Sequence, residues 1–103
     1  MEIFTDYQGH PIRLTRERWL HIVQHVEMVG MKNSIEETLD DPVLVVRSAT
    51  DETVILNYRH YSNTIVGDKW LCVAVKHSVY DAFVLTAYLT DKPKQGEVIW
   101  RKL

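Results

Sequence analysis

Apolar residues repeat at helical spacing in the first third of the chain and at strand spacing afterwards. Thr15 suits the N-cap of a helix, and Gly30 suits the residue that ends it. Between these two positions, one stripe of the helix is apolar and consists of Trp19, Ile22, Val23 and Val26. The pattern therefore predicts an amphipathic helix that starts after Thr15 and runs to Gly30.

A second, shorter helix is predicted from about Ser34 to Leu39. Ser34 and Glu37 have the spacing of a capping box, and Pro42 prevents the helix from continuing. Upstream of both helices, residues 2–14 indicate a short strand or hairpin that turns at residues 8–11.

From Pro42 onward, β-branched and aromatic residues dominate and turn-like segments separate them. This pattern predicts strands at 43–48, 54–61, 69–77 and 82–89, with a short edge strand at 97–101. Short connections favour an antiparallel meander. The expected fold is α+β, with N-terminal helices packed on a four-stranded antiparallel sheet, or a five-stranded one with the edge strand. No linker, repeat or low-complexity tract divides residues 1–103, so we expect a single domain.

Composition narrows the class of protein. Of the 103 residues, 46% are hydrophobic and 25% are charged, which is typical of a globular domain. The net charge of −2 argues against attraction of the whole surface to nucleic acid, although a local basic site is compatible with it. The lone Cys72 is expected to be a small buried hydrophobe, and the cytoplasm is the expected compartment. We expect no membrane association, because no signal peptide and no apolar run of bilayer length occur.

Candidate chemistry begins on the first predicted helix. Offsets of three and four residues return to the same helical face, so Arg18, His21 and His25 are expected to share a second stripe. Imidazoles titrate near neutral pH, and guanidinium groups bind anions. This stripe therefore suits a site that holds an anion and transfers protons.

Polar residues also interrupt the apolar strands, namely Arg47, Asn57, Arg59, Lys76, His77, Thr86 and Tyr88. Alternation along a strand places Lys76 on the same face as Cys72, and it groups Thr86 with Tyr88. A three-residue loop between the two strands would bring both groups to one face of the sheet, whereas a two-residue loop would separate them. The sequence leaves this choice open.

Other chemistries lack their motifs. His21 and His25 have the spacing of a helical zinc pair, but Ile22 stands where the glutamate of the metalloprotease motif would be, and no third ligand is indicated. A glycine-rich phosphate loop and a serine nucleophile elbow are also missing. We therefore expect no metal and no cofactor.

Several short motifs follow one another in a fixed order over residues 14–100. They are Arg18-Trp19-Leu20-His21-Ile22 with His25 and Glu27, Thr38-Leu39 with Pro42, Leu71, Val73 and Val75-Lys76, Thr86-Ala87-Tyr88, and Lys94, Gly96-Glu97 and Trp100. Their succession resembles the phage-associated barnase–EndoU–colicin–RelE-like nuclease families. The resemblance implies a RelE/EndoU-like α+β fold and a metal-independent ribonuclease, often a toxin or effector. Val26, where proline is expected, and the acidic net charge depart from the pattern.

Cleavage of RNA without a metal uses the 2′-hydroxyl of the substrate as the nucleophile. A base removes its proton, an acid protonates the leaving 5′-oxygen, and cations stabilise the phosphoryl oxygens. In this hypothesis His25 is the principal acid or base and His21 a second proton-transfer group. Lys76 and Thr86 would stabilise the phosphoryl oxygens. The expected phosphate- or RNA-binding residues are Arg59, Arg47, Arg18 and Tyr88.

Plainer interpretations stand beside these assignments. The histidines are also compatible with a solvated helix surface, and the arginines with ion pairs to carboxylates. Lys76 is also compatible with a charge at a sheet edge, and Thr86 with a residue chosen for its strand propensity. The function predicted from the sequence is a metal-independent endoribonuclease with RNA as substrate and an antitoxin or immunity protein as partner. The alternative is a catalytically inactive protein-interaction or regulatory module.

Overall fold

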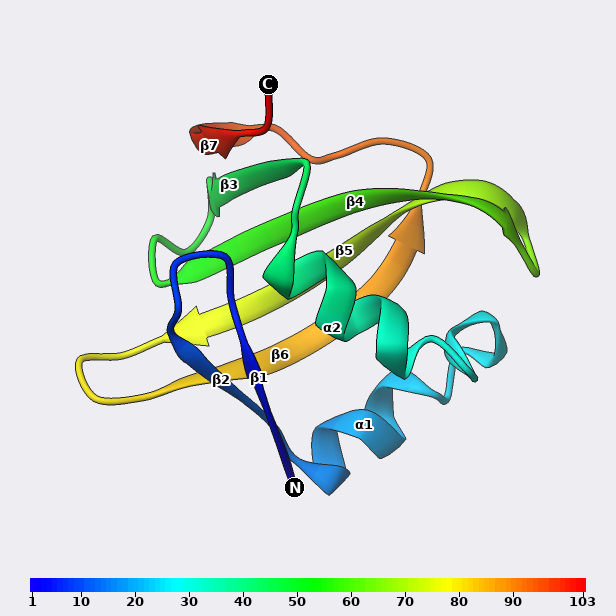
Figure 1. Cartoon of the computed structure of the whole chain (residues 1–103), viewed down its shortest axis with the longest axis horizontal. Coiled ribbons are helices and arrows are strands. Elements are labelled where there is room, and N and C mark those ends of the chain that lie inside the picture. Colours follow the sequence, from blue (N-terminus) through cyan, green and yellow to red (C-terminus); the bar gives the residue numbers. More distant parts are fainter.

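Seven strands form one mixed sheet in the order β1-β2-β6-β5-β4-β3-β7 (Figure 1). The computed structural model describes all 103 residues. The strands are β1 Glu2–Thr5, β2 Pro11–Leu14, β3 Leu44–Ser48, β4 Val54–Thr64, β5 Gly67–His77, β6 Ala82–Thr90 and β7 Gly96–Arg101. The helical elements are α1 Arg16–Ile22, the 3₁₀ turn η1 Val26–Met28 and α2 Lys32–Asp40. No helix is long and apolar enough to cross a membrane.

The predicted fold class is wrong, because the sheet is larger and mixed. Strands lie close to all five predicted positions, but residues 2–14 add a further hairpin, β1–β2, ahead of any helix. This hairpin joins the sheet through a parallel pairing of β2 with β6. The physical reason is burial, since Phe4, Ile12 and Leu14 all lie in the main core. The hairpin is therefore part of the fold and not an appendage to helices on a four-stranded sheet.

The first helix is also shorter than its sequence pattern predicts. Thr15 caps α1 as expected by accepting a hydrogen bond from the N–H of Arg18, but the helix ends at Ile22. After it, the N–H groups of Gln24 and His25 donate to the carbonyls three residues earlier, which is 3₁₀ geometry. The tighter turn leads into η1, where Met28 is fully buried.

The second helix starts earlier than predicted and without the capping box. Its N-cap is Met31, which makes no side-chain capping bond. The carbonyl oxygen of Ser34 instead accepts hydrogen bonds from the hydroxyls of Thr38 and Tyr61. α2 is thereby bonded to β4 as well as packed on the sheet.

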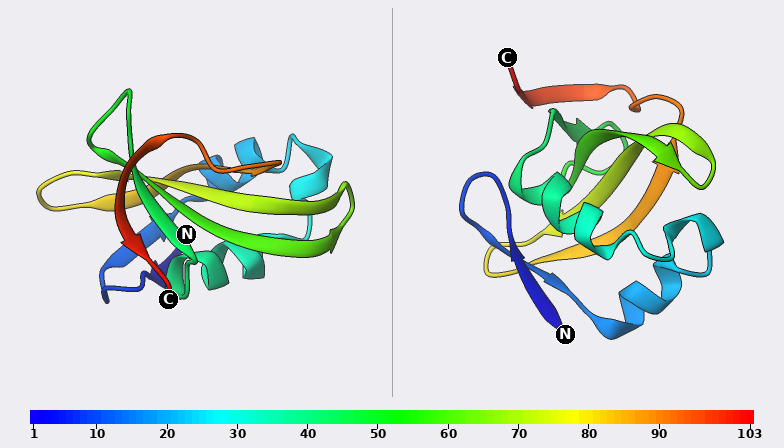
Figure 2. Two further views of the ribbon diagram at one scale, coloured as in Figure 1. Left: turned by 90° about the horizontal axis from the view of Figure 1, so that it is seen from above. Right: turned by 45° about the vertical axis from the view of Figure 1, so that its right-hand side comes forward.

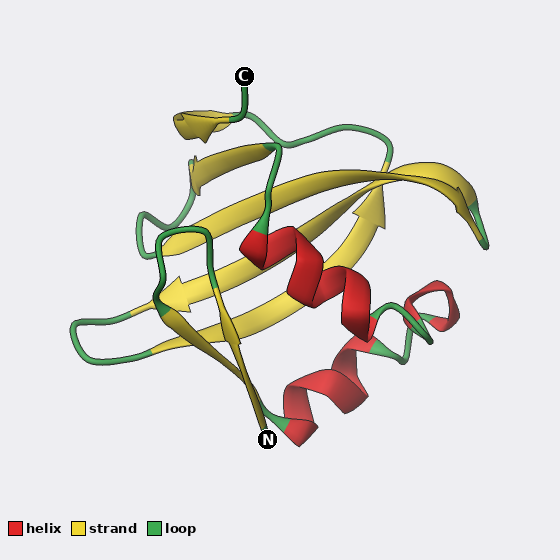
Figure 3. Cartoon of the chain, in the orientation of Figure 1, coloured by secondary structure: helices red, strands yellow, loops and turns green.

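The sheet has a core on each face. On the α2 face, residues of α1, η1 and α2 pack with β1, β2, β5 and β6, and α2 crosses the sheet (Figures 2 and 3). On the other face, here the open face, no helical residue contributes to the core of Val46, Val54, Leu56, Tyr58, Cys72 and Ala74. The segment between β6 and β7 reaches this open-face core, because the N–H of Lys94 donates to the buried Tyr58 hydroxyl at 3.0 Å. Cys72 is buried and unpaired, as the sequence predicts.

Candidate functional site

The residues predicted on the first helix do not converge on one site with the sheet residues. His21 is exposed in the last turn of α1, and His25 lies beyond the helix. The side chain of His25 is 69% exposed, and its Nδ1 lies 3.9 Å from Glu27 Oε1. Arg18 faces β6, where its guanidinium carbon lies 6.0 Å from the centre of the Phe83 ring. Early termination of α1 therefore removes His25 from the stripe predicted with Arg18 and His21.

The two arginines predicted from the strands form ion pairs. Arg59 donates to the backbone and side-chain oxygens of Asp41, and it also lies 3.4 Å from Glu37. Because both acids belong to the C-terminal end of α2, Arg59 connects this helix to β4. Arg47 donates to Glu97 at 2.8 Å and to the carbonyl of Glu52 at 3.2 Å. Arg47 keeps further N–H donors beyond these two bonds.

Three of the predicted residues gather on the open face of the sheet. Thr86 and Tyr88 line a hollow of about 380 Å³, here the open-face hollow. Its other lining residues are Ser48, Ala49, Thr50, Asp51, Val54, Leu56, Ala74, Leu85, Lys94 and Gln95. Lys76 borders it through Asp51, because Lys76 Nζ donates to Asp51 Oδ2 at 2.8 Å. No residue of α1 or η1 lines this hollow.

A β-bulge settles the face on which Thr86 lies. The loop between β5 and β6 has four residues, and His77 pairs with Ala82. Continued regularly, this register would turn Thr86 towards the α2 face. Instead Val75 pairs with Val84 and Ala74 with Thr86, so Leu85 is an extra residue. The bulge thus places Thr86 and Tyr88 on the same face as Ala74 and Cys72.

The charges at the open-face hollow are one ion pair and one free ammonium group. Lys76, together with Thr53, lowers the pKa of Asp51 to about 2, so this carboxylate is ionised at neutral pH. Lys94 forms no ion pair, and its Nζ lies 5.2 Å from the centre of the Tyr88 ring. The hollow therefore presents a cation that a bound anion can neutralise.

Tyr88, which lines the hollow, and Tyr58, in the core against which Tyr88 packs, differ in hydrogen bonding. The Tyr58 hydroxyl accepts from the Lys94 backbone, whereas the Tyr88 hydroxyl is the one buried side-chain polar atom without a partner. Burial raises the pKa of both phenols well above the ordinary value, so both stay protonated at neutral pH.

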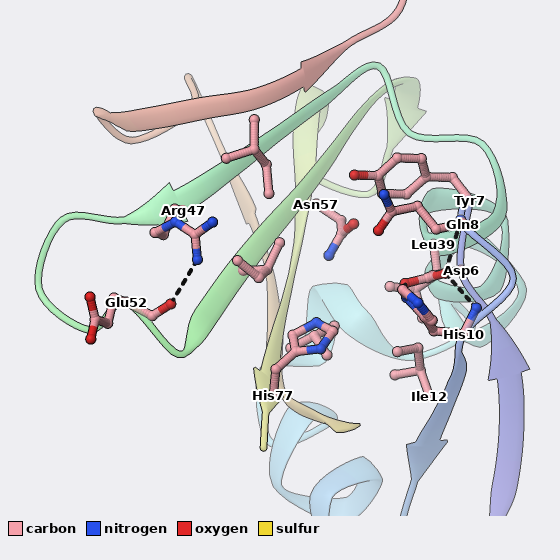
Figure 4. A pocket seen from close by; sticks show the side chains of 13 residues that line it. Asp6, Tyr7, Gln8, His10, Ile12, Leu39, Arg47, Glu52, Asn57 and His77 are labelled. Atoms are coloured by element: carbon pink, nitrogen blue, oxygen red, sulfur yellow. Dashed lines mark hydrogen bonds and ion pairs between the residues drawn. The ribbon is translucent and has the colours of Figure 1, made fainter. Parts of the chain in front are cut away.

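A second concavity lies on the α2 face, between the β1–β2 turn and the ends of β3, β4 and β5 (Figure 4). This polar cavity measures about 250 Å³, and its polar lining includes Asp6, His10, Arg47, Asn57 and His77. Asp6 Oδ1 accepts hydrogen bonds from the N–H groups of Gln8 and His10, which holds the turn in place. Burial lowers the pKa of His77, so its imidazole is neutral at pH 7.

Sequence reasoning singled out Asn57 and His77 as polar interruptions of apolar strands but gave them no role. A polar residue at a position where the strand pattern is otherwise apolar is the signal that could have identified them. His10 carried no such signal, since it lies in a turn where polar residues are usual. No family model, curated protein or solved structure matches this chain.

Proposed function

We propose that this chain is a metal-independent endoribonuclease that binds the phosphate of its RNA substrate in the open-face hollow. One observation carries the proposal. Lys76, Thr86, Tyr88 and Lys94 come from three separate motifs of the nuclease resemblance, and they meet at one hollow on the face that no helix covers. Ammonium groups and a hydroxyl are the donors that stabilise negative charge on phosphoryl oxygens.

In this proposal the residues at the hollow have separate roles in phosphate binding and proton transfer. Lys94 and Lys76 would bind the phosphoryl oxygens, and Thr86 would donate a hydrogen bond to one of them. Lys94 would also protonate the leaving 5′-oxygen. Attack by the 2′-hydroxyl requires a base, and Asp51 is the one carboxylate that lines the hollow. A carboxylate with a pKa of about 2 is a weak base, so slow turnover is expected.

The experiment is incubation of the purified protein with RNA in EDTA, with detection of 2′,3′-cyclic phosphate ends. Lys94→Ala is expected to lower the rate by about 10²–10³, as for loss of one charge-stabilising group. Lys92→Ala is the matched control, because Lys92 is exposed and lies outside the hollow. Equal rates for the two variants would place the reaction elsewhere.

The pH profile distinguishes Asp51 from His25 as the base. If Asp51 is the base, the cleavage rate has no acidic limb between about pH 5 and pH 8, because its pKa lies near 2. Asp51→Asn then abolishes cleavage, and His25→Ala does not. An acidic limb within this range that disappears in His25→Ala would return the role to the histidine.

The second candidate function is a protein-interaction or regulatory module without catalysis. Lys76 is already neutralised by Asp51, and no imidazole lines the hollow, which favours this module. RNA that stays intact at high protein concentration would support it. As a nuclease, the chain would act on cytoplasmic RNA, and it would require an antitoxin or immunity protein in the cell that makes it.

A further inference from the structure

We infer that the polar cavity on the α2 face binds a nucleobase, and that it reads a base next to the phosphate held in the open-face hollow. The link to RNA rests on the proposed function, whereas binding of a free base is independent of it. The inference is carried by an unpaired carboxamide, by the size of the cavity, and by the loop that the two concavities share.

Asn57 is the unusual residue of this cavity. It is 3% exposed and lies on β4, opposite Val73, on the α2 face of the sheet. Its Nδ2 donates to the Val73 carbonyl at 3.3 Å, and its oxygen has no partner in the protein. The oxygen is not sealed in, because Tyr88 holds the only fully buried unpartnered atom. Asn57 therefore offers one free N–H and one free oxygen side by side, facing the cavity (Figure 4).

A carboxamide with a free donor and a free acceptor matches the edge of a nucleobase. Asparagine pairs in this way with the N6 amino group and N7 of adenine. The apolar part of the lining, against which a heterocycle can pack, consists of Ile12, Leu39, Ile55, Val75 and Ile99. The cavity of about 250 Å³ has room for roughly eight groups of water size at about 30 Å³ each, which suits one base.

The rim of the cavity suits the sugar-phosphate chain. Arg47 uses two of its N–H groups on Glu97 and Glu52, and the others remain for a ligand. His77 is neutral at pH 7, so it can donate or accept a hydrogen bond there. His10 is held beside Asp6, with its Nδ1 3.4 Å from Asp6 Oδ2, which leaves the Asp6 carboxylate satisfied by its own turn.

The end of β3 and the β3–β4 connection form a wall of both concavities. Arg47 and Glu52 line the polar cavity, whereas Ser48, Thr50 and Asp51 line the open-face hollow. Neighbouring residues of one short segment thus face the two sites. The two sites lie on opposite faces of the sheet, so an RNA strand with a base in one and a phosphate in the other would pass around this segment.

The test is NMR titration of the full chain with adenosine, cytidine, guanosine and uridine, without any cleavage assay. Adenosine is expected to shift the side-chain amide of Asn57 and the ring signals of His77. Asn57→Leu, which keeps the volume and removes the carboxamide, should weaken adenosine binding about tenfold or more. Asn33→Ala is the control, since Asn33 is exposed on α2.

A second variant covers the case in which Asn57→Leu does not fold. Arg47→Ala should abolish any preference for adenosine 5′-monophosphate over adenosine. Absence of shifts with all four nucleosides, or unchanged binding in both variants, would overturn the inference. Lys94→Ala, which is expected to slow cleavage, should still bind adenosine, so failure of the nuclease proposal and failure of the base site are separable.

Discussion

The buried Tyr58 and the half-buried Tyr88, which packs against the open-face core, differ by a hydrogen bond to the backbone. Tyr58 accepts from the Lys94 backbone, while the Tyr88 hydroxyl has no partner. A buried polar group without a partner costs free energy, and a satisfied one contributes about 1 kcal/mol. Tyr58→Phe should therefore lower the free energy of unfolding by about 1 kcal/mol, and Tyr88→Phe should leave it unchanged or raise it. Urea denaturation of both variants measures the difference, and equal losses would show that Tyr88 has a partner.

His77 gives the stability of the protein a pH dependence. Burial holds its pKa below 6.5, with Asp6 opposing the shift and His10 adding to it. In the unfolded state His77 therefore binds a proton more readily than in the folded state. The contribution of the neutral His77 to the free energy of unfolding is complete above about pH 6.5, and it is lost as the pH falls through the folded-state pKa. We expect the urea midpoint to fall between about pH 7.5 and pH 5, and to fall less in His77→Gln. An identical fall in both proteins would assign the effect to other groups.

At the scale of elements, the bulge in β6 decides which side chains meet. Deletion of Leu85 should leave a regular ladder with Thr86 still opposite Ala74, since Leu85 is the residue without a cross-strand partner. Deletion of Ala87 keeps the bulge but turns Tyr88 towards the α2 face, because strand residues alternate with a period of two. The variant without Leu85 is expected to fold with a modest loss of stability, whereas the variant without Ala87 is expected not to fold. Cross-strand NOEs between Ala74 and Thr86 provide the measurement.

The sequence predicts an element well where neighbouring residues determine it, and poorly where tertiary contacts do. The strands after Pro42 were predictable because β-branched residues and turns are neighbours along the chain. The end of α1 was not, because burial of Met28 in the tertiary core determines it. The sheet face on which Thr86 lies depends on a β-bulge that no residue type in the sequence predicts. Lys76, Thr86 and Tyr88 were therefore identifiable as candidates, but the open-face hollow that brings them together was not.

At the scale of the whole molecule, the β1–β2 hairpin completes the main core. Phe4, Ile12 and Leu14 are at most 6% exposed. Loss of a buried aliphatic or aromatic side chain costs about 2–5 kcal/mol, so removal of all three approaches or exceeds the usual net stability of about 5–15 kcal/mol. A chain that lacks residues 1–14 should therefore be unfolded by circular dichroism. Removal of the fully exposed Leu103 alone is the control and should change nothing.

The same hairpin is joined to the rest of the sheet by a single residue pair, Arg13 with Phe83. Arg13 strengthens this contact from its side chain, with its guanidinium over the Phe83 ring and bonded to Asp81. Between β4 and β5, by contrast, nine residue pairs hold the strands together. Amide protons of β2 should thus exchange with deuterium before those of the central strands. The N-terminus would then be the first point at which a protease enters the folded chain.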